Sequence, residues 1–221
     1  MNPTDPVQSF MLALSALFSI VNPIGAALIF SQVTADRTHE QRVALARLIG
    51  FYSALVMLGA LWAGAYILGF FGVSLAALRI AGGLFVATRA WELLSAPERI
   101  EAMKQRQAEG AEGASAVAFF PLTMPFTTGP GTISVAIALG ANRPMSSISE
   151  AAPFFLGASL AALVVAATVV VAYSFADRVT SLLGETGARV VSRLAAFLML
   201  CVGTQITLNG ITDVLASVLR N

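Results

Sequence analysis

Long apolar runs alternate with short charged stretches along the whole chain. Charged and turn residues delimit six runs, at residues 10–33, 49–70, 75–94, 116–140, 152–176 and 194–216. Each run is close to the roughly 20 apolar residues that an α-helix needs to cross a bilayer. The pattern therefore predicts an all-α membrane protein with six transmembrane helices.

The third run is the weakest of the six, because Arg89 and Glu92 lie near its end. Long charged side chains near a helix end can reach the membrane surface, and residues three apart lie on one face of a helix. We interpret these two residues as an ion pair at the end of a transmembrane helix.

Composition supports the membrane assignment and excludes other classes. Hydrophobic residues make up 57% of the chain and charged residues 11%, whereas about a quarter of the residues in soluble domains are charged. The formal net charge is +1 and the chain has no dense Lys/Arg cluster, so we expect a lipid bilayer and no nucleic acid as partner. The single cysteine, Cys201, lies in an apolar run and is interpreted as a small buried residue.

The distribution of basic residues predicts the orientation. With six crossings, ten basic residues fall in connections on one side of the membrane and three fall on the other. Basic residues accumulate on the cytoplasmic side of membrane proteins. Both termini are therefore expected outside the cytoplasm. The first ten residues contain no Lys or Arg, unlike a secretory signal peptide, and are expected to be retained.

A polar stretch divides the chain into two sets of three runs. Residues 95–115 carry charges at helical spacing and are predicted to form a cytoplasmic linker, with repeats at residues 1–94 and 116–221. Because three is an odd number, the second set enters the membrane from the opposite side. The chain is therefore predicted to contain two inverted three-helix repeats within one membrane domain.

The first run of each set has helix-breaking residues in its interior. The string "NPIG" starts at Asn22, and "TTGPG" starts at Thr127. Proline removes a backbone donor, and glycine tolerates conformations that other residues avoid. Two ordinary proline kinks would explain part of this pattern. The clustering of Asn, Thr, Pro and Gly favours helices that are interrupted near the bilayer midplane.

Interrupted helices at membrane depth can form a binding site from backbone groups, because such backbone persists only where protein buries it or a cavity hydrates it. Amides after Pro23 and Gly129 are expected to hold a carboxylate, and freed carbonyls an ammonium group or small cation. The middle of no run contains a charged residue, so a small zwitterion fits better than a bare ion. Gly25 and Gly131 are expected to permit close approach of the ligand, and the Asn and Thr side chains to hydrogen-bond. The candidate substrate-binding residues are Asn22, Pro23, Gly25, Thr127, Thr128, Gly129, Pro130, Gly131 and Thr132.

The strings "NPIG", "PLTMPFTTGPGTIS" and "LRIAGGLF" resemble those of the MarC family of bacterial inner-membrane proteins. The resemblance extends over nearly the whole chain and is most specific in the second string. It implies a six-helix protein with two inverted repeats, related to the LysE-like exporters, with members associated with transport of small neutral amino acids. The family motifs fall, without departure, on Asn22, Pro23, Gly25, Pro125, Gly129, Pro130 and Gly131.

The sequence therefore predicts a secondary transporter of small neutral amino acids, of the glycine, alanine and serine class, that works by alternating access. No cofactor and no metal site are expected. The coupling ion, Na⁺ or H⁺, stays open, as do the direction of transport, the preferred amino acid and the oligomeric state.

Three other functions have less support. An intramembrane hydrolase needs a nucleophile with a base, or a metal cluster, at membrane depth, whereas the only histidine, His39, lies in a charged connection; we expect no enzyme. A cation transporter stays open, because carbonyls and hydroxyls such as those of Thr123 and Thr132 are hard oxygen ligands. A membrane scaffold explains the helices but not their paired breaks.

Two further groups of residues are interpreted as packing elements. Gly82 and Gly83 are expected to bring helices close together. Gln205, Thr207 and Asn209 in the last run are polar, and they are expected either to form hydrogen bonds between helices or to line the site.

Overall fold

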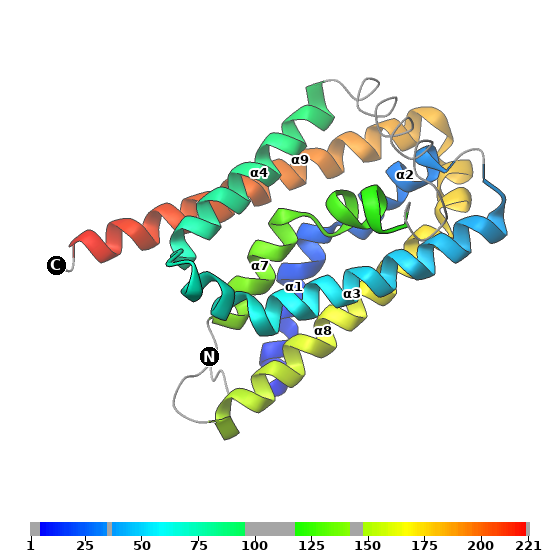
Figure 1. Ribbon diagram of the computed structural model, residues 1–221. Helices are drawn as coiled ribbons and strands as arrows, with labels where there is room; N and C mark the ends of the chain where they lie inside the picture. The colour runs from blue at the N-terminus through cyan, green and yellow to red at the C-terminus, as the bar shows by residue number, and fades with distance from the viewer. Residues whose placement is uncertain (1–4, 35–36, 96–117, 142–147, 220–221) are drawn as a thin grey trace.

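The computed structural model describes residues 5–34, 37–95, 118–141 and 148–219, and every regular element in these ranges is a helix. The elements are α1 (Pro6–Val21), α2 (Pro23–Val33), α3 (His39–Phe70), α4 (Leu75–Ser95), the π-helical segment η1 (Ala118–Thr127), α7 (Pro130–Ala141), α8 (Ile148–Ser174) and α9 (Ala176–Leu219) (Figure 1). The predicted linker at residues 95–115 lies almost wholly outside the described residues.

Four stretches within the described residues are long and apolar enough to cross a membrane: Pro6–Leu28, His39–Phe70, Ala151–Ser174 and Ala196–Leu219. They correspond to four of the six predicted crossings. The third predicted crossing forms α4, which contains charged residues, and the fourth is divided between η1 and the 12-residue α7. The membrane class is confirmed, and the count of six crossings stays a prediction.

The helix boundaries differ from the prediction at two places. Helix α3 begins at His39, because Thr38 and Gln41 form a reciprocal capping box, in which the Gln41 amide donates to Thr38 Oγ1 (3.3 Å) and the Thr38 amide to Gln41 Oε1 (3.1 Å). The charged connection predicted before residue 194 is helical, because α9 begins at Ala176 and is 44 residues long, and the apolar span within it, Ala196–Leu219, agrees with the predicted crossing. No proline interrupts this charged stretch, so the backbone ladder continues through it.

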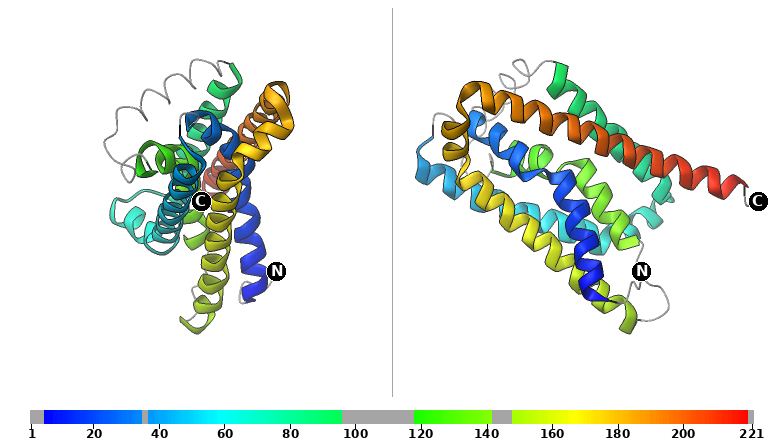
Figure 2. Two further views of the ribbon diagram at one scale, coloured as in Figure 1. Left: turned by 90° about the vertical axis from the view of Figure 1, so that its right-hand side faces the viewer. Right: turned by 180° about the vertical axis from the view of Figure 1, so that it is seen from behind.

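The helices pack in three layers. Helices α4 and α9 lie side by side in one layer, and α3 and α8 form another (Figure 1). Between them lie α1, α2, η1 and α7, the segments that contain the predicted interruptions, as the view from behind also shows (Figure 2). Continuous helices therefore cover α1, α2 and α7 on two sides, whereas η1 packs mainly on α3 and exposes Phe119 and Phe120.

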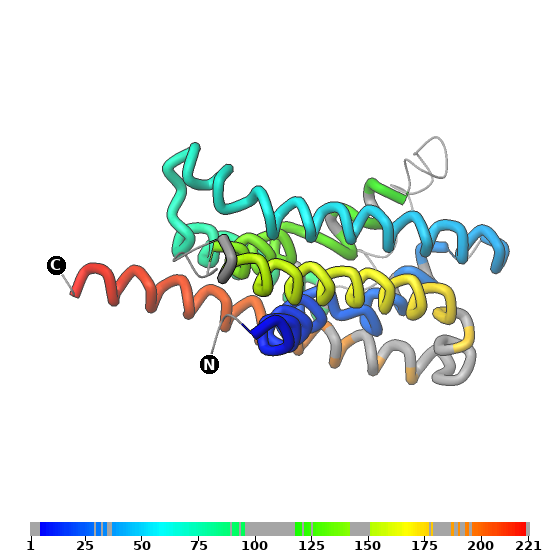
Figure 3. Tube along the Cα trace, turned by 90° about the horizontal axis from the view of Figure 1, so that it is seen from below, coloured from blue at the N-terminus to red at the C-terminus, as the bar shows by residue number. Residues whose placement is uncertain are grey.

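The outer surface is largely apolar. Large exposed hydrophobic side chains include Phe51, Trp62, Leu160, Val171, Phe197, Leu208 and Leu215. Exposing so many apolar side chains to water would be energetically unfavourable, whereas exposing them to lipid is not. The C-terminal part of α9 extends beyond the other helices (Figure 3). Cys201 is exposed rather than buried, because α9 contacts α4 through a different, narrow face.

Glycines set the separation between α4 and α9. A Cβ atom on Gly203 would lie 2.6 Å from the Ala87 amide nitrogen and 2.8 Å from the Gly83 carbonyl oxygen. Gly82 likewise faces Ser134 of α7. The packing role predicted for Gly82 and Gly83 is confirmed, since larger residues would force the backbones apart.

We expect Gly203→Ala to lower the stability of the protein by about 1–3 kcal/mol, because the new methyl group meets backbone atoms that move only with their helices. The matched control is Gly59→Ala in α3, where a Cβ atom would have no neighbour within 4 Å. Alanine is the better helix former there, so this variant should be as stable as the wild type or more so. Thermal unfolding in detergent measures both. Equal shifts in the two variants would contradict the packing role.

Candidate functional site

The first interruption is a single residue between α1 and α2. Asn22 adopts the left-handed conformation (φ 46°, ψ 64°), which asparagine tolerates better than most residues. Its amide donates to the Phe18 carbonyl (2.9 Å), and its carbonyl accepts from the Ala26 amide (3.0 Å). Its side-chain Oδ1 accepts from the Gly25 amide (3.3 Å). Asn22 therefore ends one helix and caps the next, which begins with Pro23.

The second interruption is longer. Within η1, Phe120 (φ −127°, ψ 125°) and Met124 (φ −109°, ψ 119°) have extended backbone. Thr128 and Gly129 belong to no helix, and α7 then begins at Pro130. The chain therefore crosses this region with an irregular backbone.

Threonine hydroxyls compensate for the poor backbone geometry of η1. Thr123 Oγ1 donates to the Ala118 carbonyl, and Thr127 Oγ1 donates to the Leu122 carbonyl, each at 2.7 Å and five residues back. The Thr128 amide also reaches the Thr123 carbonyl (2.8 Å). Because buried carbonyls need donors, these contacts explain why a threonine-rich string is suitable here.

The two interruptions end in the same way. Each second half-helix has proline at its first position, Pro23 in α2 and Pro130 in α7, where the missing amide costs nothing. The residue before each proline accepts from the amide four residues on, Asn22 from Ala26 at 3.0 Å and Gly129 from Ile133 at 3.1 Å. The two helix starts therefore share one local design.

The two interruptions lie close together. A Cβ atom on Gly131 would contact Val86 Cγ2 of α4 and would lie 3.5 Å from Ile20 Cδ1. Ile20 is two residues before Asn22. The first turn of α7 is therefore packed between the last turn of α1 and α4. Because Gly131 packs directly against neighbouring side chains, a large side chain at this position would displace α4 as well as alter any ligand contact.

The two helix starts differ in how their amides are satisfied. In α2 the Asn22 side chain takes the Gly25 amide, whereas Gly129 has no side chain to cap α7. The amides of Gly131 and Thr132 precede the first intrahelical bond, and the described residues provide them with no acceptor. Both residues are buried. Two unpaired donors at a buried helix N-terminus are suited to an anionic group.

Thr128 adds an unpaired hydroxyl at the same place. Its Oγ1 atom is buried and has no hydrogen-bond partner among the described residues, a property that it shares with Ser53 Oγ. Buried hydroxyls normally have partners. Since Thr128 lies two residues before Pro130, its hydroxyl and the α7 amides belong to one small region.

Tyr173 joins the second interruption to α8 and α2. Its hydroxyl lies 2.7 Å from Thr127 Oγ1, and its ring stacks on Phe30 with a centroid distance of 4.5 Å. Sequence reasoning missed Tyr173. The available signal was a tyrosine, the only one in the largely apolar span Ala151–Ser174, because a buried tyrosine hydroxyl usually has a partner.

The nine predicted site residues divide by burial. Pro23, Gly25, Thr127, Thr128, Gly131 and Thr132 are buried, Asn22 and Gly129 are half-buried, and Pro130 is exposed. Their backbone comes together from α1, α2, η1 and α7 as described above. The side chain of Pro125, which carries part of the resemblance, lies outside the described residues, as does that of Arg89, so the predicted Arg89–Glu92 pair has no structural account.

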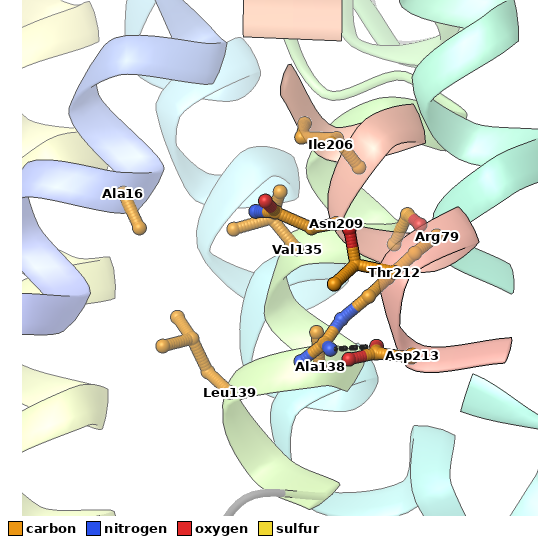
Figure 4. Close-up of a pocket in the computed structure, with 10 residues that line it drawn as sticks. Ala16, Arg79, Val135, Ala138, Leu139, Ile206, Asn209, Thr212 and Asp213 are labelled. Atoms are coloured by element: carbon orange, nitrogen blue, oxygen red, sulfur yellow. Dashed lines mark hydrogen bonds and ion pairs between the residues drawn. The ribbon is translucent and has the colours of Figure 1, made fainter. Parts of the chain in front are cut away.

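A pocket of about 420 Å³ opens along α7 beyond the interruption. Four helices contribute its lining residues, Ala16, Arg79, Ser134, Val135, Ala138, Leu139, Ile206, Asn209, Thr212 and Asp213 (Figure 4). Ser134 is one helical turn after Pro130. The pocket therefore adjoins the interruption but does not include the nine predicted residues.

An ion pair lies in this pocket. The Arg79 guanidinium of α4 donates to the Asp213 carboxylate of α9 (Figure 4). Sequence reasoning did not pair these two residues. Asn209 lines the pocket and accepts from Gln205 Nε2 (2.9 Å), and Thr207 Oγ1 donates to the Gly203 carbonyl (3.0 Å). These bonds lie within α9 rather than between helices. The described residues contain no group of three or more His, Cys, Asp or Glu placed to hold a metal ion.

Comparison with known proteins gives one family. The family described as "MarC family integral membrane protein" matches residues 7–215. Relatives called "UPF0056 inner membrane protein MarC" come from Escherichia coli strain K12, Escherichia coli O6:H1 strain CFT073 and Shigella flexneri. Each is 28% identical over 215 residues, which cover 96% of this chain and 97% of the relative. No solved structure matches the chain.

We expect Tyr173→Phe to destabilise the protein by about 1–3 kcal/mol, because the Thr127 hydroxyl loses a buried partner. A double-mutant cycle with Thr127→Val, followed by chemical unfolding in detergent, isolates the interaction. The double variant should be less destabilised than the sum of the single variants. Strict additivity would mean that the 2.7 Å contact contributes nothing to stability.

Proposed function

The chain belongs to the MarC family of integral membrane proteins, and from that membership we propose that it is a secondary transporter of small neutral amino acids. The substrates are glycine, alanine and serine, and the protein is a multi-pass component of the bacterial inner membrane, where the relatives are named as residing. In this proposal the chain catalyses no chemical reaction.

One observation carries the proposal: the start of α7 has two buried amides, of Gly131 and Thr132, with no acceptor among the described residues. A substrate carboxylate would accept from both, aided by the helix dipole. The unpaired hydroxyl of Thr128 would provide a third hydrogen bond. These groups bind a carboxylate without any basic side chain in the membrane.

The substrate ammonium group would face the carbonyls of the first interruption. Pro23 has no amide, so the Ser19 carbonyl lacks the donor that would normally come four residues later. Ile20, in the same turn, lies against Gly131. Backbone acceptors from one broken helix and backbone donors from the other would therefore hold the two ends of one zwitterion.

The packing of the helices supports two inverted repeats. Suppose that α1 is exchanged with η1, α2 with α7, α3 with α8, and α4 with α9. Each main pair of packed helices then corresponds to another pair that is also packed, although the extent of contact differs between some of the corresponding pairs. Helix α1 packs on α8 as η1 packs on α3, α2 on α9 as α7 on α4, and the pairs α3–α8 and α4–α9 each map onto themselves. Relative motion of two such halves about the interruptions provides alternating access. Both termini lie outside the cytoplasm in this proposal.

Alanine flux in liposomes tests the proposal. We expect Thr128→Val to reduce uptake of labelled alanine by about ten- to a hundredfold, the effect of losing one hydrogen bond to a charged group. Because the Thr128 hydroxyl has no partner among the described residues, its removal should not lower the thermal stability. Loss of transport by a stable variant therefore cannot be ascribed to misfolding.

The matched control is Ser53→Ala in α3, which removes the second buried hydroxyl that has no partner among the described residues. This variant and His39→Ala should transport alanine at the wild-type rate. Equal alanine flux in Thr128→Val and the wild type would contradict the assignment of the substrate site to the interruptions. No alanine flux by the wild type, with or without sodium and proton gradients, would reject the transporter assignment.

A further inference from the structure

The pocket beyond the interruption contains two opposite charges inside a membrane protein. Arg79 and Asp213 have side chains that are 20% and 44% exposed, and they approach each other across the pocket wall formed by α4 and α9 (Figure 4). Asp213 belongs to the apolar stretch Ala196–Leu219. Ionisable residues in such stretches are costly and commonly mark a functional site.

The ion pair is unlike a contact that only joins two helices. The close approach of α4 and α9 already comes from glycines, Gly83 and Gly203 a turn or more from the charges and Gly210 beside Arg79. Arginine has five donors and a carboxylate has about four acceptor positions, whereas the pair uses one Arg79 nitrogen and one Asp213 oxygen. Both groups therefore retain capacity for a ligand in the pocket.

The rest of the lining matches a small, partly apolar ligand. Ser134, Asn209 and Thr212 provide neutral polar groups. Ala16 of α1 and Leu139 of α7 lie across the pocket from the ion pair, and Val135, Ala138 and Ile206 complete the apolar part of the lining (Figure 4). The volume of about 420 Å³ exceeds that of a small amino acid and leaves room for several waters at about 30 Å³ each.

We propose that this pocket binds a free α-amino acid, with its carboxylate on Arg79 and its ammonium group on Asp213. In an α-amino acid the ammonium and carboxylate groups are bonded to the same carbon atom. Because the Arg79 and Asp213 side chains are in contact, a single such molecule can reach both. A small apolar side chain would lie against the aliphatic wall. A planar guanidinium binds a carboxylate through two parallel hydrogen bonds.

This pocket is a second site, distinct from the broken helices but connected to them by α7. Ser134 in its wall is one turn after Pro130, and Ser134 Oγ donates to the Leu78 carbonyl beside Arg79 (3.0 Å). The choice of alanine as probe rests on the proposed function, whereas the assignment of Arg79 and Asp213 rests on the pocket alone.

Calorimetric titration of the purified full-length protein in detergent tests the assignment. The ligands are L-alanine, propionate, which lacks the ammonium group, and ethylamine, which lacks the carboxylate. All titrations are repeated in the Thr128→Val background, which weakens binding at the interruptions. We expect alanine to bind at least about tenfold more tightly than either half-ligand, because charge-assisted hydrogen bonds contribute at both ends.

The variants Asp213→Asn and Arg79→Gln each remove one charge and keep the size of the side chain. In Asp213→Asn the affinity for alanine should fall about tenfold or more, towards that of propionate, whose own affinity should not fall. In Arg79→Gln the affinity for alanine should fall towards the affinity for ethylamine. A purely structural role would not produce this ligand-specific pattern.

The control variants remove charges elsewhere. Asp5→Asn keeps the side-chain cap on the Val7 amide of α1, and Arg47→Gln changes an exposed residue of α3; both should retain the wild-type preference for alanine. If Asp213→Asn and Arg79→Gln lose thermal stability but keep the wild-type ratios among the three ligands, the pair only joins helices and the assignment is overturned. The two proposals can fail separately. If the wild type transports no alanine but still binds alanine more tightly than either half-ligand, and this preference depends on Asp213, the transporter proposal is rejected and the pocket assignment is retained.

Discussion

Backbone amides and carbonyls inside a membrane protein must find partners within the protein, because lipid offers none. This constraint explains the layered arrangement. The continuous helices α3, α4, α8 and α9 satisfy their own backbone and face lipid with apolar side chains. The irregular segments lie between them. Within these segments Asn22, Thr123 and Thr127 provide the hydrogen bonds that a regular helix would have made.

The same constraint makes the start of α7 exceptional. Where α2 begins, the Asn22 side chain satisfies an amide, whereas Gly129 leaves the amides of Gly131 and Thr132 to a partner outside the helix. Among the described residues, these buried polar groups have no partner, which costs free energy. Binding a solute that carries a carboxylate would recover this cost, which links the local structure to the proposed transport.

Helix α7 connects the features that matter for function. Its first turn contacts α1 and α4 through Gly131, and its later turns, from Ser134 on, line the pocket with Arg79 and Asp213. A displacement of this short helix would alter both regions together. Close glycine contacts along α4 and α9 make the adjoining layer a stiff pair against which such a displacement can occur.

The sequence by itself determined the membrane class, the positions of both interruptions and the residues that would start the second half-helices, because hydropathy and the chemistry of Pro, Gly and Asn act locally. Only the tertiary structure decided which groups meet. It paired Arg79 with Asp213, 134 residues apart in the chain, placed Tyr173 against Thr127, turned Gly131 towards Val86 and left Cys201 exposed. These contacts depend on how helices that are distant in sequence are oriented and packed against each other. A local sequence pattern does not specify this relative orientation.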